Sequence, residues 1–409
     1  MYSVQSSYRT ENYLRTYPLV IPAQAGIQAK SIANDWIPAC AGMTGGKYTL
    51  VPLGAKPLVR HKKQINIDGS TSEFPMSVLV TGAAGFIGMH VAQALLDRGE
   101  QVVGVDTLTP YYDPALKQAR LEQLEGRNGF THEALDFSLE GTAHTLVQQY
   151  PDLDRIIHLG AQPGVRHSID QPGEYLQANL AGQLTLMELA RALMDRPGGC
   201  RNFVYASSSS VYGANRDIPF SVDQKADRPM SFYGATKKAG EAMAYSYAHL
   251  YRIPTIGLRF FTVYGPWGRP DMSPYIFTSR ILSGEPIQVF NNGQMKRDFT
   301  YIDDIVAGVV SALDTPPSCE DGEGDGSAPC RIYNLGNNQP VALLDYIRVI
   351  EKACGREAAL EMKPMQPGDV LETYADIATS QRDLGFEPAT SIDVGIPRFV
   401  DWYRQYHKI

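Results

Sequence analysis

Residues 80–88 read Val-Thr-Gly-Ala-Ala-Gly-Phe-Ile-Gly. The run places three glycines between an apolar segment, 77–81, and a segment with helical spacing, 86–98. Glycine permits a tight turn there and lets backbone amides approach an anion at the N-terminus of the helix. The order of strand, turn and helix predicts a site for the pyrophosphate of a dinucleotide. Its expected contacts are Gly82, Gly85, Phe86, Ile87 and Gly88.

A carboxylate follows this turn at a characteristic distance. Asp106 ends the next expected strand, 18 residues after Gly88. A dinucleotide-binding fold places an acidic residue about 20 residues beyond its glycines, on the adenosine ribose. Because a carboxylate accepts hydrogen bonds from a free 2′-hydroxyl and repels a 2′-phosphate, the sequence favours NAD over NADP. Asp136, expected at the end of the third strand, either meets the adenine or caps its own loop, and the pattern leaves both open.

Strand-like and helix-like segments alternate from Met76 onward. Such alternation is typical of α/β proteins with a parallel sheet and helices on both faces. We therefore predict a doubly wound parallel (Rossmann) sheet. The expected strands cover 77–81, 101–106, 131–136, 154–159, 202–206 and 255–260, and the expected helices cover 86–98, 175–193 and 233–250.

The alternation breaks up after about residue 262. Short strand candidates, 287–290 and 298–301, mix there with helix candidates, 342–353 and 392–406. We expect a cofactor-binding domain over 76–262 that includes the catalytic residues. A smaller α/β substrate lobe over 263–409 follows, with some segments returning to the first domain. The acidic, glycine-rich segment 319–328 is expected to be a loop.

Residues 1–75 differ from the rest because they lack sustained periodicity. They contain a near-repeat, 21–27 and 37–43, and two units are too few for a repeat fold. We expect a disordered or non-native extension, with natural translation starting at Met76. The intact mass of the protein from its native host distinguishes this start from Met1.

The bulk composition excludes several classes of protein. The chain has 409 residues, 44% of them apolar, and a net charge of −7, which argues against nucleic-acid binding. Its five cysteines show no CxxC pair, as expected of reduced thiols in the cytoplasm. No segment approaches the roughly 20 apolar residues of a membrane span. We predict a cytoplasmic protein with no membrane segment and no metal site.

A tyrosine and a lysine lie four residues apart, at Tyr233 and Lys237, in an expected helix. That spacing puts both side chains on one face. A nearby ammonium favours the ionised phenol, so the pair is expected to provide a phenolate base. The serine run 207–210 lies upstream, at the end of an expected strand, where a hydroxyl can align a reacting alcohol. Together with the glycine turn, these residues indicate oxidation of an alcohol beside a nicotinamide.

Several longer segments extend this pattern. They are Val80–Gly88, Tyr205–Gly213, Gly257–Met272, Arg297–Asp304 and Met365–Val370. With these segments the chain from Met76 to its C-terminus resembles the extended short-chain dehydrogenase/reductase family, which includes nucleotide-sugar epimerases and dehydratases. Within it, the UDP-glucuronate 4-epimerase subgroup is most similar, and Tyr111-Tyr112-Asp113 also fits that subgroup.

The resemblance implies roles for individual residues. Tyr233 would be the base, Lys237 would hold the nicotinamide ribose and lower the tyrosine pKa, and Ser208 would be the hydroxyl partner. The substrate contacts that it implies are Ser209, Ser210, Asn179, Thr262, Arg269, Arg297 and Asp369. Of these, Thr262 and Arg269 would lie near a sugar carboxylate, and Arg297 and Asp369 near the UDP diphosphate and ribose. The assignment among the adjacent serines is open by one position.

The implied reaction is inversion at C4 of a UDP-sugar. Tyr233 would take the C4 hydroxyl proton while hydride passes to NAD⁺, and the 4-keto sugar would turn over before hydride returns. UDP-glucuronate giving UDP-galacturonate, for polysaccharide biosynthesis, fits best, and a homodimer formed through helix 233–250 is expected.

Other activities remain open. A UDP-glucose 4-epimerase is the first alternative, and a UDP-glucuronate decarboxylase or 4,6-dehydratase the second. The dehydratase is disfavoured because Ser209 and Ser210 stand where it needs carboxylates. A non-catalytic NAD-binding module is disfavoured because Tyr233 and Lys237 are both present.

Overall fold

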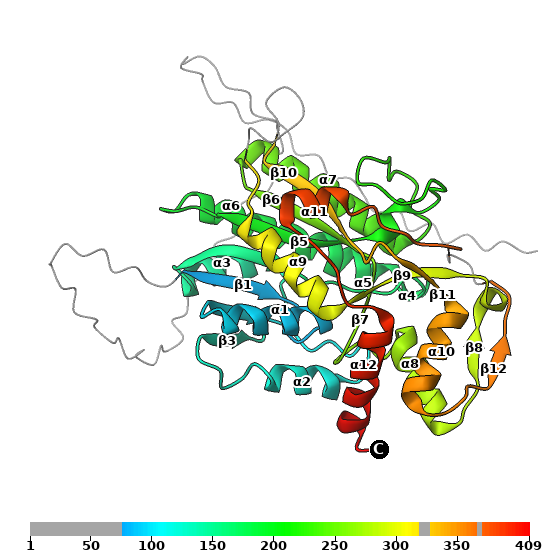
Figure 1. Ribbon diagram of the computed structural model, residues 1–409. Coiled ribbons are helices and arrows are strands. Elements are labelled where there is room, and N and C mark those ends of the chain that lie inside the picture. The colour runs from blue at the N-terminus through cyan, green and yellow to red at the C-terminus, as the bar shows by residue number, and fades with distance from the viewer. Residues whose placement is uncertain (1–75, 319–327, 366–369) are drawn as a thin grey trace, which may run out of the picture. The chain divides into compact units, whose positions relative to one another are not determined.

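The computed structural model describes residues 76–318, 328–365 and 370–409, all within one compact unit, Ser70–Ile409. Its centre is a seven-stranded parallel sheet (Figure 1). The strand order is β10-β6-β5-β4-β1-β2-β3. The strands are β1 (Ser77–Thr81), β2 (Gln101–Val105), β3 (Phe130–Glu133), β4 (Leu153–His158), β5 (Asn202–Ser208), β6 (Thr255–Phe260) and β10 (Cys330–Leu335). The order reverses between β1 and β4, where ligands bind in such sheets.

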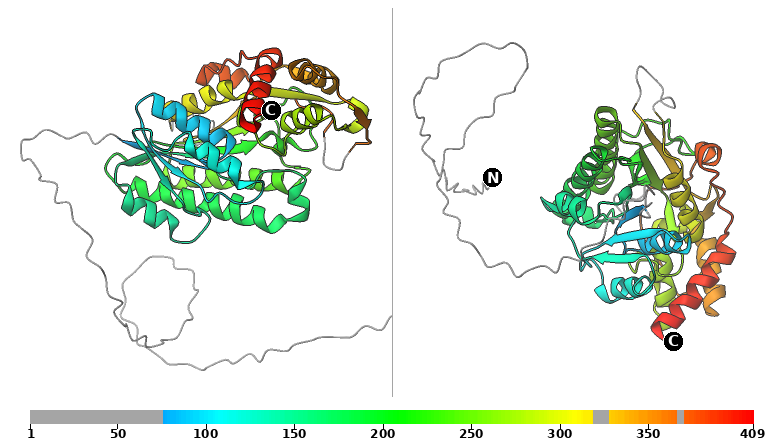
Figure 2. Two further views of the ribbon diagram at one scale, coloured as in Figure 1. Left: turned by 90° about the horizontal axis from the view of Figure 1, so that it is seen from below. Right: turned by 90° about the vertical axis from the view of Figure 1, so that its left-hand side faces the viewer.

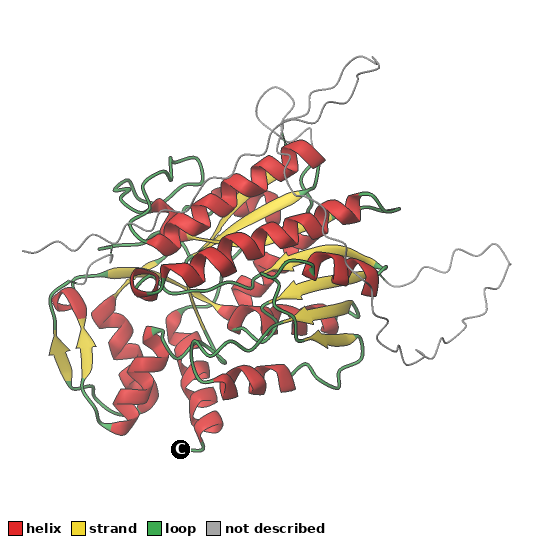
Figure 3. Ribbon diagram, turned by 180° about the vertical axis from the view of Figure 1, so that it is seen from behind, coloured by secondary structure: helices red, strands yellow, loops and turns green. Residues whose placement is uncertain are grey.

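Helices cover both faces of this sheet, as the alternation of buried side chains in β1 requires. Val78 and Val80 join one hydrophobic core with helices α1, α2 and α9, whereas Leu79 joins a second core with α3, α6 and α7. Figure 2 shows the strands between blue α1 and the green helices, and Figure 3 shows the helices lying across the strands from behind. The bounds are α1 (Phe86–Asp97), α2 (Pro114–Glu122), α3 (Thr142–Gln149), α6 (Gly182–Met194), α7 (Phe232–Tyr251) and α9 (Ile302–Asp314). The doubly wound Rossmann fold predicted from the sequence is confirmed.

A smaller group of elements lies beside the sheet. A three-stranded sheet, β11-β9-β7, and a two-stranded sheet, β12-β8, pack with α8, α10 and α12 (Figure 1). The strands are β7 (Thr262–Tyr264), β8 (Ile287–Val289), β9 (Lys296–Tyr301), β11 (Pro340–Ala342) and β12 (Leu360–Met362). The helices are α8 (Ser273–Ser283), α10 (Leu343–Cys354) and α12 (Ile392–His407), while α11 (Ala378–Leu384) packs on β10.

Several expected boundaries differ from the structure. The expected helix 175–193 is α5 (Pro172–Tyr175), a π-helix (Leu176–Ala181) and α6 in succession. The third strand ends at Glu133, so Asp136 lies in the loop beyond it. Several elements were not predicted: α2, α3, α4 (His167–Asp170), α8, α9, α11, β7, β10, β11, β12 and the two 3₁₀ turns Ser209–Tyr212 and Phe290–Gly293.

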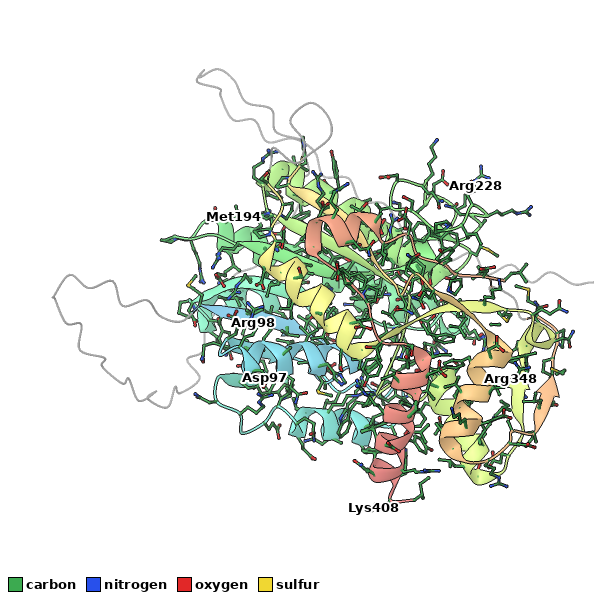
Figure 4. The ribbon with its side chains drawn as sticks, viewed as in Figure 1. Asp97, Arg98, Met194, Arg228, Arg348 and Lys408 are labelled. Carbon is green, nitrogen blue, oxygen red and sulfur yellow. The ribbon has the colours of Figure 1, made fainter. Side chains whose placement is uncertain are left out.

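Two elements beyond residue 262 belong with the large sheet: β10 pairs with β6, and α9 packs against α1 and β5. Arg98 and Asp314 join the ends of α1 and α9 through an ion pair of 2.7 Å, at the edge where Figure 4 labels Arg98.

The extension 1–75 and most of the expected loop 319–328 lie outside the described residues. No helix in the described ranges is long and apolar enough to cross a membrane.

The glycine turn tolerates no side chain at its last position. A Cβ at Gly88 would lie 2.0 Å from the Gly82 carbonyl oxygen, which is backbone and cannot rotate away. We expect Gly88→Ala to lower the free energy of unfolding by about 1–3 kcal/mol or more and to reduce the NAD bound. Urea unfolding and the NAD content of purified protein measure both effects. Gly173→Ala is the matched control, because nothing lies within 4 Å of a Cβ there; equal losses would contradict the prediction.

Candidate active site

The glycine turn packs against the loop after β4. Gly82 has a φ of 72°, and a Cβ on it would lie 2.8 Å from the Gly160 nitrogen. α1 begins at Phe86 with Gly85 as its N-cap, and neither a side-chain cap nor an acidic residue satisfies its first turn. The first amides of a helix need partners and favour an anion. Gly82, Gly85, Phe86, Ile87 and Gly88 therefore form a cradle that fits a pyrophosphate.

Asp106 lies directly against this cradle. Its buried carboxylate accepts hydrogen bonds from the Ala84 nitrogen at 3.1 Å and the Leu108 nitrogen at 2.8 Å. A fixed negative charge beside the turn suits ribose hydroxyls and disfavours a 2′-phosphate. The residues present thus fit NAD.

Asp136 is used locally. Its carboxylate accepts from the backbone nitrogen and the hydroxyl of Ser138, at 2.8 Å and 2.6 Å. This is the loop-capping geometry, one of the two possibilities that the sequence left open. Both of these hydrogen bonds lie within the loop after β3, not at the glycine turn.

Tyr233 and Lys237 occupy the first turns of α7, which is capped by the Ser231 hydroxyl accepting from the Gly234 nitrogen at 3.0 Å. Lys237 is buried, and its Nζ donates to the Ala206 carbonyl oxygen at 2.8 Å. Tyr233 is partly exposed and shares a hydrogen bond with Ser208, at the end of β5. The fold thus brings the tyrosine, the lysine and the end of the serine strand together.

The resemblance implies that Lys237 lowers the pKa of Tyr233, and this role stays a prediction. Burial raises the pKa of Tyr233 above its usual value, while the Ser208 hydrogen bond and the positive charge of Arg269 act in the opposite direction. The ammonium of Lys237 donates to the Ala206 carbonyl, and burial lowers the pKa of Lys237 to about 8. Arg269, which the sequence placed near the sugar, is thus a cation that favours the phenolate of Tyr233.

The serines of the run have distinct surroundings. Ser207 donates its hydroxyl to Glu241 at 2.7 Å, whereas the Ser208 hydroxyl donates to that of Ser210 at 3.1 Å. Ser209 and Ser210 lie in the 3₁₀ turn after β5, both partly buried. Ser208, paired with Ser210, is the serine that hydrogen-bonds Tyr233.

Asn179 lies in the π-helix and is buried. Its amide oxygen accepts from the Gln162 nitrogen at 2.8 Å, and its amide nitrogen donates to the Gln162 carbonyl and the Thr236 hydroxyl, both at 3.1 Å. Short π-helical segments are frequent at functional sites. Asn179 ties the loop after β4 to the residue that precedes Lys237.

The residues expected near the sugar divide into two groups. Thr262 begins β7, two residues beyond Phe260, which pairs with Ser208 across β5 and β6. Arg269 donates from Nε and Nη2 to Asp271, at 3.0 Å and 2.6 Å, and its charge reaches Tyr233.

The second group is Arg297 and Asp369. Arg297, on β9, donates to the carbonyl oxygens of Lys296 and Leu371. Asp369 lies outside the described residues.

Sequence reasoning missed a buried ion pair behind these residues. Glu241 accepts from Nε and Nη2 of Arg259, on β6, at 2.7 Å and 2.9 Å, and both side chains are 2% exposed. The available signal was spacing, because Glu241 follows Lys237 by four residues on α7. It also missed Arg120, whose acceptors lie up to 148 positions away, and Asp271, which pairs with Arg269 two residues away and with the distant Tyr111.

Burial of Lys237 opposes folding below pH 8. A pKa lowered from 10.5 to about 8 corresponds to about 3 kcal/mol. Between pH 8 and 10.5 only the unfolded chain holds the proton, so this cost fades as pH rises. We expect NAD-free Lys237→Met to be more stable than the parent at pH 7. Removing the buried charge should stabilise the protein by up to about 3 kcal/mol, from which about 1 kcal/mol is subtracted for the lost hydrogen bond to Ala206. At pH 10 the gain should be smaller. Urea unfolding at both pH values measures it, with exposed Lys352→Met as control; a gain independent of pH would contradict it.

The chain is similar in sequence to known proteins. Residues 78–336 match the family described as NAD dependent epimerase/dehydratase. The chain is 46% identical over 342 residues to a probable UDP-glucuronate 4-epimerase of Rhizobium meliloti, covering 81% of this chain and 98% of the relative. It is 44% identical over 343 residues to UDP-glucuronate 4-epimerase 4 of Arabidopsis thaliana, covering 81% and 76%.

The chain is also similar in fold to a solved structure. The UDP-glucuronic acid 4-epimerase from Bacillus cereus, in complex with UDP-glucuronic acid and NAD, matches with a TM-score of 0.72 at 34% identity, over 81% of this chain and 100% of that one. The family match runs from β1 through β10 and so includes the glycine turn, the serine strand and α7. By this shared architecture and sequence, the chain belongs to the NAD-dependent epimerase/dehydratase family.

Proposed function

We propose that this protein inverts C4 of UDP-glucuronate to give UDP-galacturonate, with NAD as its cofactor. The observation that carries the proposal is the placement of Arg269, whose guanidinium charge acts on Tyr233. A fixed cation beside the base matches an acidic sugar, because guanidinium binds carboxylate through parallel donors. The relatives named as UDP-glucuronate 4-epimerases support the same substrate.

Each proposed site residue has its own role in this reaction. Tyr233 Oη would receive the C4 hydroxyl proton, and Ser208 would orient that hydroxyl. Lys237 would hold the nicotinamide ribose, as its buried position four residues along α7 allows. Bound NAD supplies a reversible hydride acceptor, so that the sugar leaves with no net oxidation. Arg269 and Thr262 would fix the sugar carboxylate and so oppose loss of CO₂ from a 4-keto uronate.

Arg297 would meet the UDP diphosphate, and Asp369 the uridine ribose. The Arg297 guanidinium donates to the carbonyl oxygen of its neighbour Lys296 and to that of Leu371, and the second bond joins β9 to the segment that follows residue 370. Ser209, Ser210 and Asn179 would line the crevice on the sugar side.

Two finer features follow from the same proposal. A charged nucleotide-sugar substrate would be consistent with an enzyme of the cytoplasm that supplies polysaccharide precursors. A homodimer is supported by exposed apolar side chains on α6 and α7, where Leu184, Tyr245 and Leu250 are 43%, 54% and 63% exposed. Sedimentation velocity measures this assembly directly.

The reaction is tested with purified protein and UDP-glucuronate, without added NAD. We expect ¹H NMR to show UDP-galacturonate accumulating to equilibrium, with no pentose product. Tyr233→Phe should lower kcat by at least about 100-fold, because the proton acceptor is gone, with the thermal unfolding midpoint unchanged.

Three results would contradict the proposal. A UDP-pentose product indicates a decarboxylase, turnover of UDP-glucose alone indicates a neutral-sugar epimerase, and Tyr233→Phe as active as its parent removes the base. Tyr245→Phe, an exposed tyrosine of the same helix, is the control for the substitution itself.

A further inference from the structure

A fully buried arginine on α2 joins two loops that the proposed chemistry does not connect. Arg120 donates from Nε and Nη2 to the Trp267 carbonyl oxygen, at 3.0 Å and 2.7 Å, and from Nη2 to the Gly268 carbonyl at 3.2 Å. Its Nη1 donates to the Ala84 carbonyl at 3.3 Å and to the Tyr112 hydroxyl. One guanidinium therefore spans the glycine turn and the loop that leads into Arg269.

Burial of Arg120 disfavours its positive charge. Its side chain is 0% exposed, and burial lowers its pKa from the usual value. The direct acceptors are neutral carbonyls and a phenol, and the Asp106 carboxylate favours the charged form by less than burial opposes it. Because burying this charge opposes folding, a positional role explains Arg120 better than a stabilising one.

The far loop is held in an unfavourable backbone conformation. Trp267 has a φ of 64°, a left-handed value that a bulky residue adopts only when its surroundings impose it. Its ring packs on Trp402 and Tyr406 of α12, with centroids 5.4 Å and 5.6 Å away, while its carbonyl receives two bonds from Arg120. The loop is thus fixed from both sides just before Arg269.

The segment Tyr111–Tyr112 supports the same loop at its other end. The Tyr111 hydroxyl donates to Asp271 at 3.1 Å, and Asp271 in turn accepts from Nε and Nη2 of Arg269. This leaves Nη1 of Arg269 outside the pair. Adjacent tyrosines after β2 therefore reach the two ends of one loop, Tyr112 through Arg120 and Tyr111 through Asp271.

We propose that Arg120 is a positioning residue that sets Arg269 against the acidic group of the sugar by fixing the Trp267–Gly268 carbonyls at a constant distance from the cofactor turn. The inference rests on the proposed function, because it assigns Arg269 to a carboxylate. A lysine cannot replace Arg120, since a single ammonium lacks the planar fork that reaches both loops at once.

The test compares binding of two probes to the NAD-loaded protein by calorimetry. UDP lacks the sugar, whereas UDP-glucuronate carries the carboxylate. We expect Arg120→Lys to weaken UDP-glucuronate binding by about tenfold or more, as a misplaced side chain does, and to change UDP binding by less than about twofold. Arg269→Ala is the reference and should show the same selective loss.

The matched control is Arg155→Lys, on β4. Arg155 is also largely buried and donates to Glu100 at 2.7 Å and Asp154 at 3.1 Å, but it contacts neither loop. Both affinities should stay unchanged in this variant. Tyr112→Phe, which removes one acceptor of Arg120 and keeps the ring, should give a smaller selective loss, and thermal unfolding confirms that each variant is folded.

The outcomes separate the two proposals. If wild-type protein binds UDP-glucuronate no better than UDP, the proposed substrate is wrong and this inference falls with it. If wild-type protein binds and epimerises UDP-glucuronate but Arg120→Lys weakens both probes equally, or neither, Arg120 is only structural and the positioning role alone is overturned.

Discussion

One buried ion pair joins α7 to the central sheet. Glu241 of α7 and Arg259 of β6 meet through two hydrogen bonds, and the Ser207 hydroxyl of β5 donates to the same carboxylate. One carboxylate therefore joins α7, β5 and β6, of which α7 and β5 carry the proposed reacting groups. Removing one partner of such a pair typically costs about 3–5 kcal/mol, because the other charge is left buried. The positions of Tyr233, Lys237 and Ser208 relative to one another follow from this contact.

Burial and charge have opposite effects on the pKa of Tyr233. Burial disfavours the phenolate, whereas Arg269 and Ser208 favour it. Arg269 is itself held by Asp271, so the charge that acts on the tyrosine is shared with a carboxylate. If Arg269 binds the sugar carboxylate as proposed, recognition of the sugar is linked to proton transfer at Tyr233. The positioning role proposed for Arg120 would extend that linkage to the glycine turn.

Much of the fold was predictable, because its signals are local. Ser77–Thr81 and Thr255–Phe260 are strands with the predicted bounds, since short apolar runs between glycine or proline turns have few alternatives. α9 and β10, which pack on or join the large sheet, were not predicted as elements; the sequence indicated only that some segments beyond residue 262 return to the first domain. Nothing local distinguishes a strand that pairs with β6 from one that pairs with β9; that choice is made by the packing of distant segments.

The sequence by itself determined the cofactor turn, the Tyr233–Lys237 spacing and the family, because each depends on residues a few positions apart on one element. Only the tertiary structure decided that Lys237 donates to the Ala206 carbonyl, that the charge of Arg269 acts on Tyr233, and that Arg120 joins Ala84 to Trp267. These contacts join residues 31 to 147 positions apart. Their energies depend on burial, which has no counterpart in the spacing of residues along a chain.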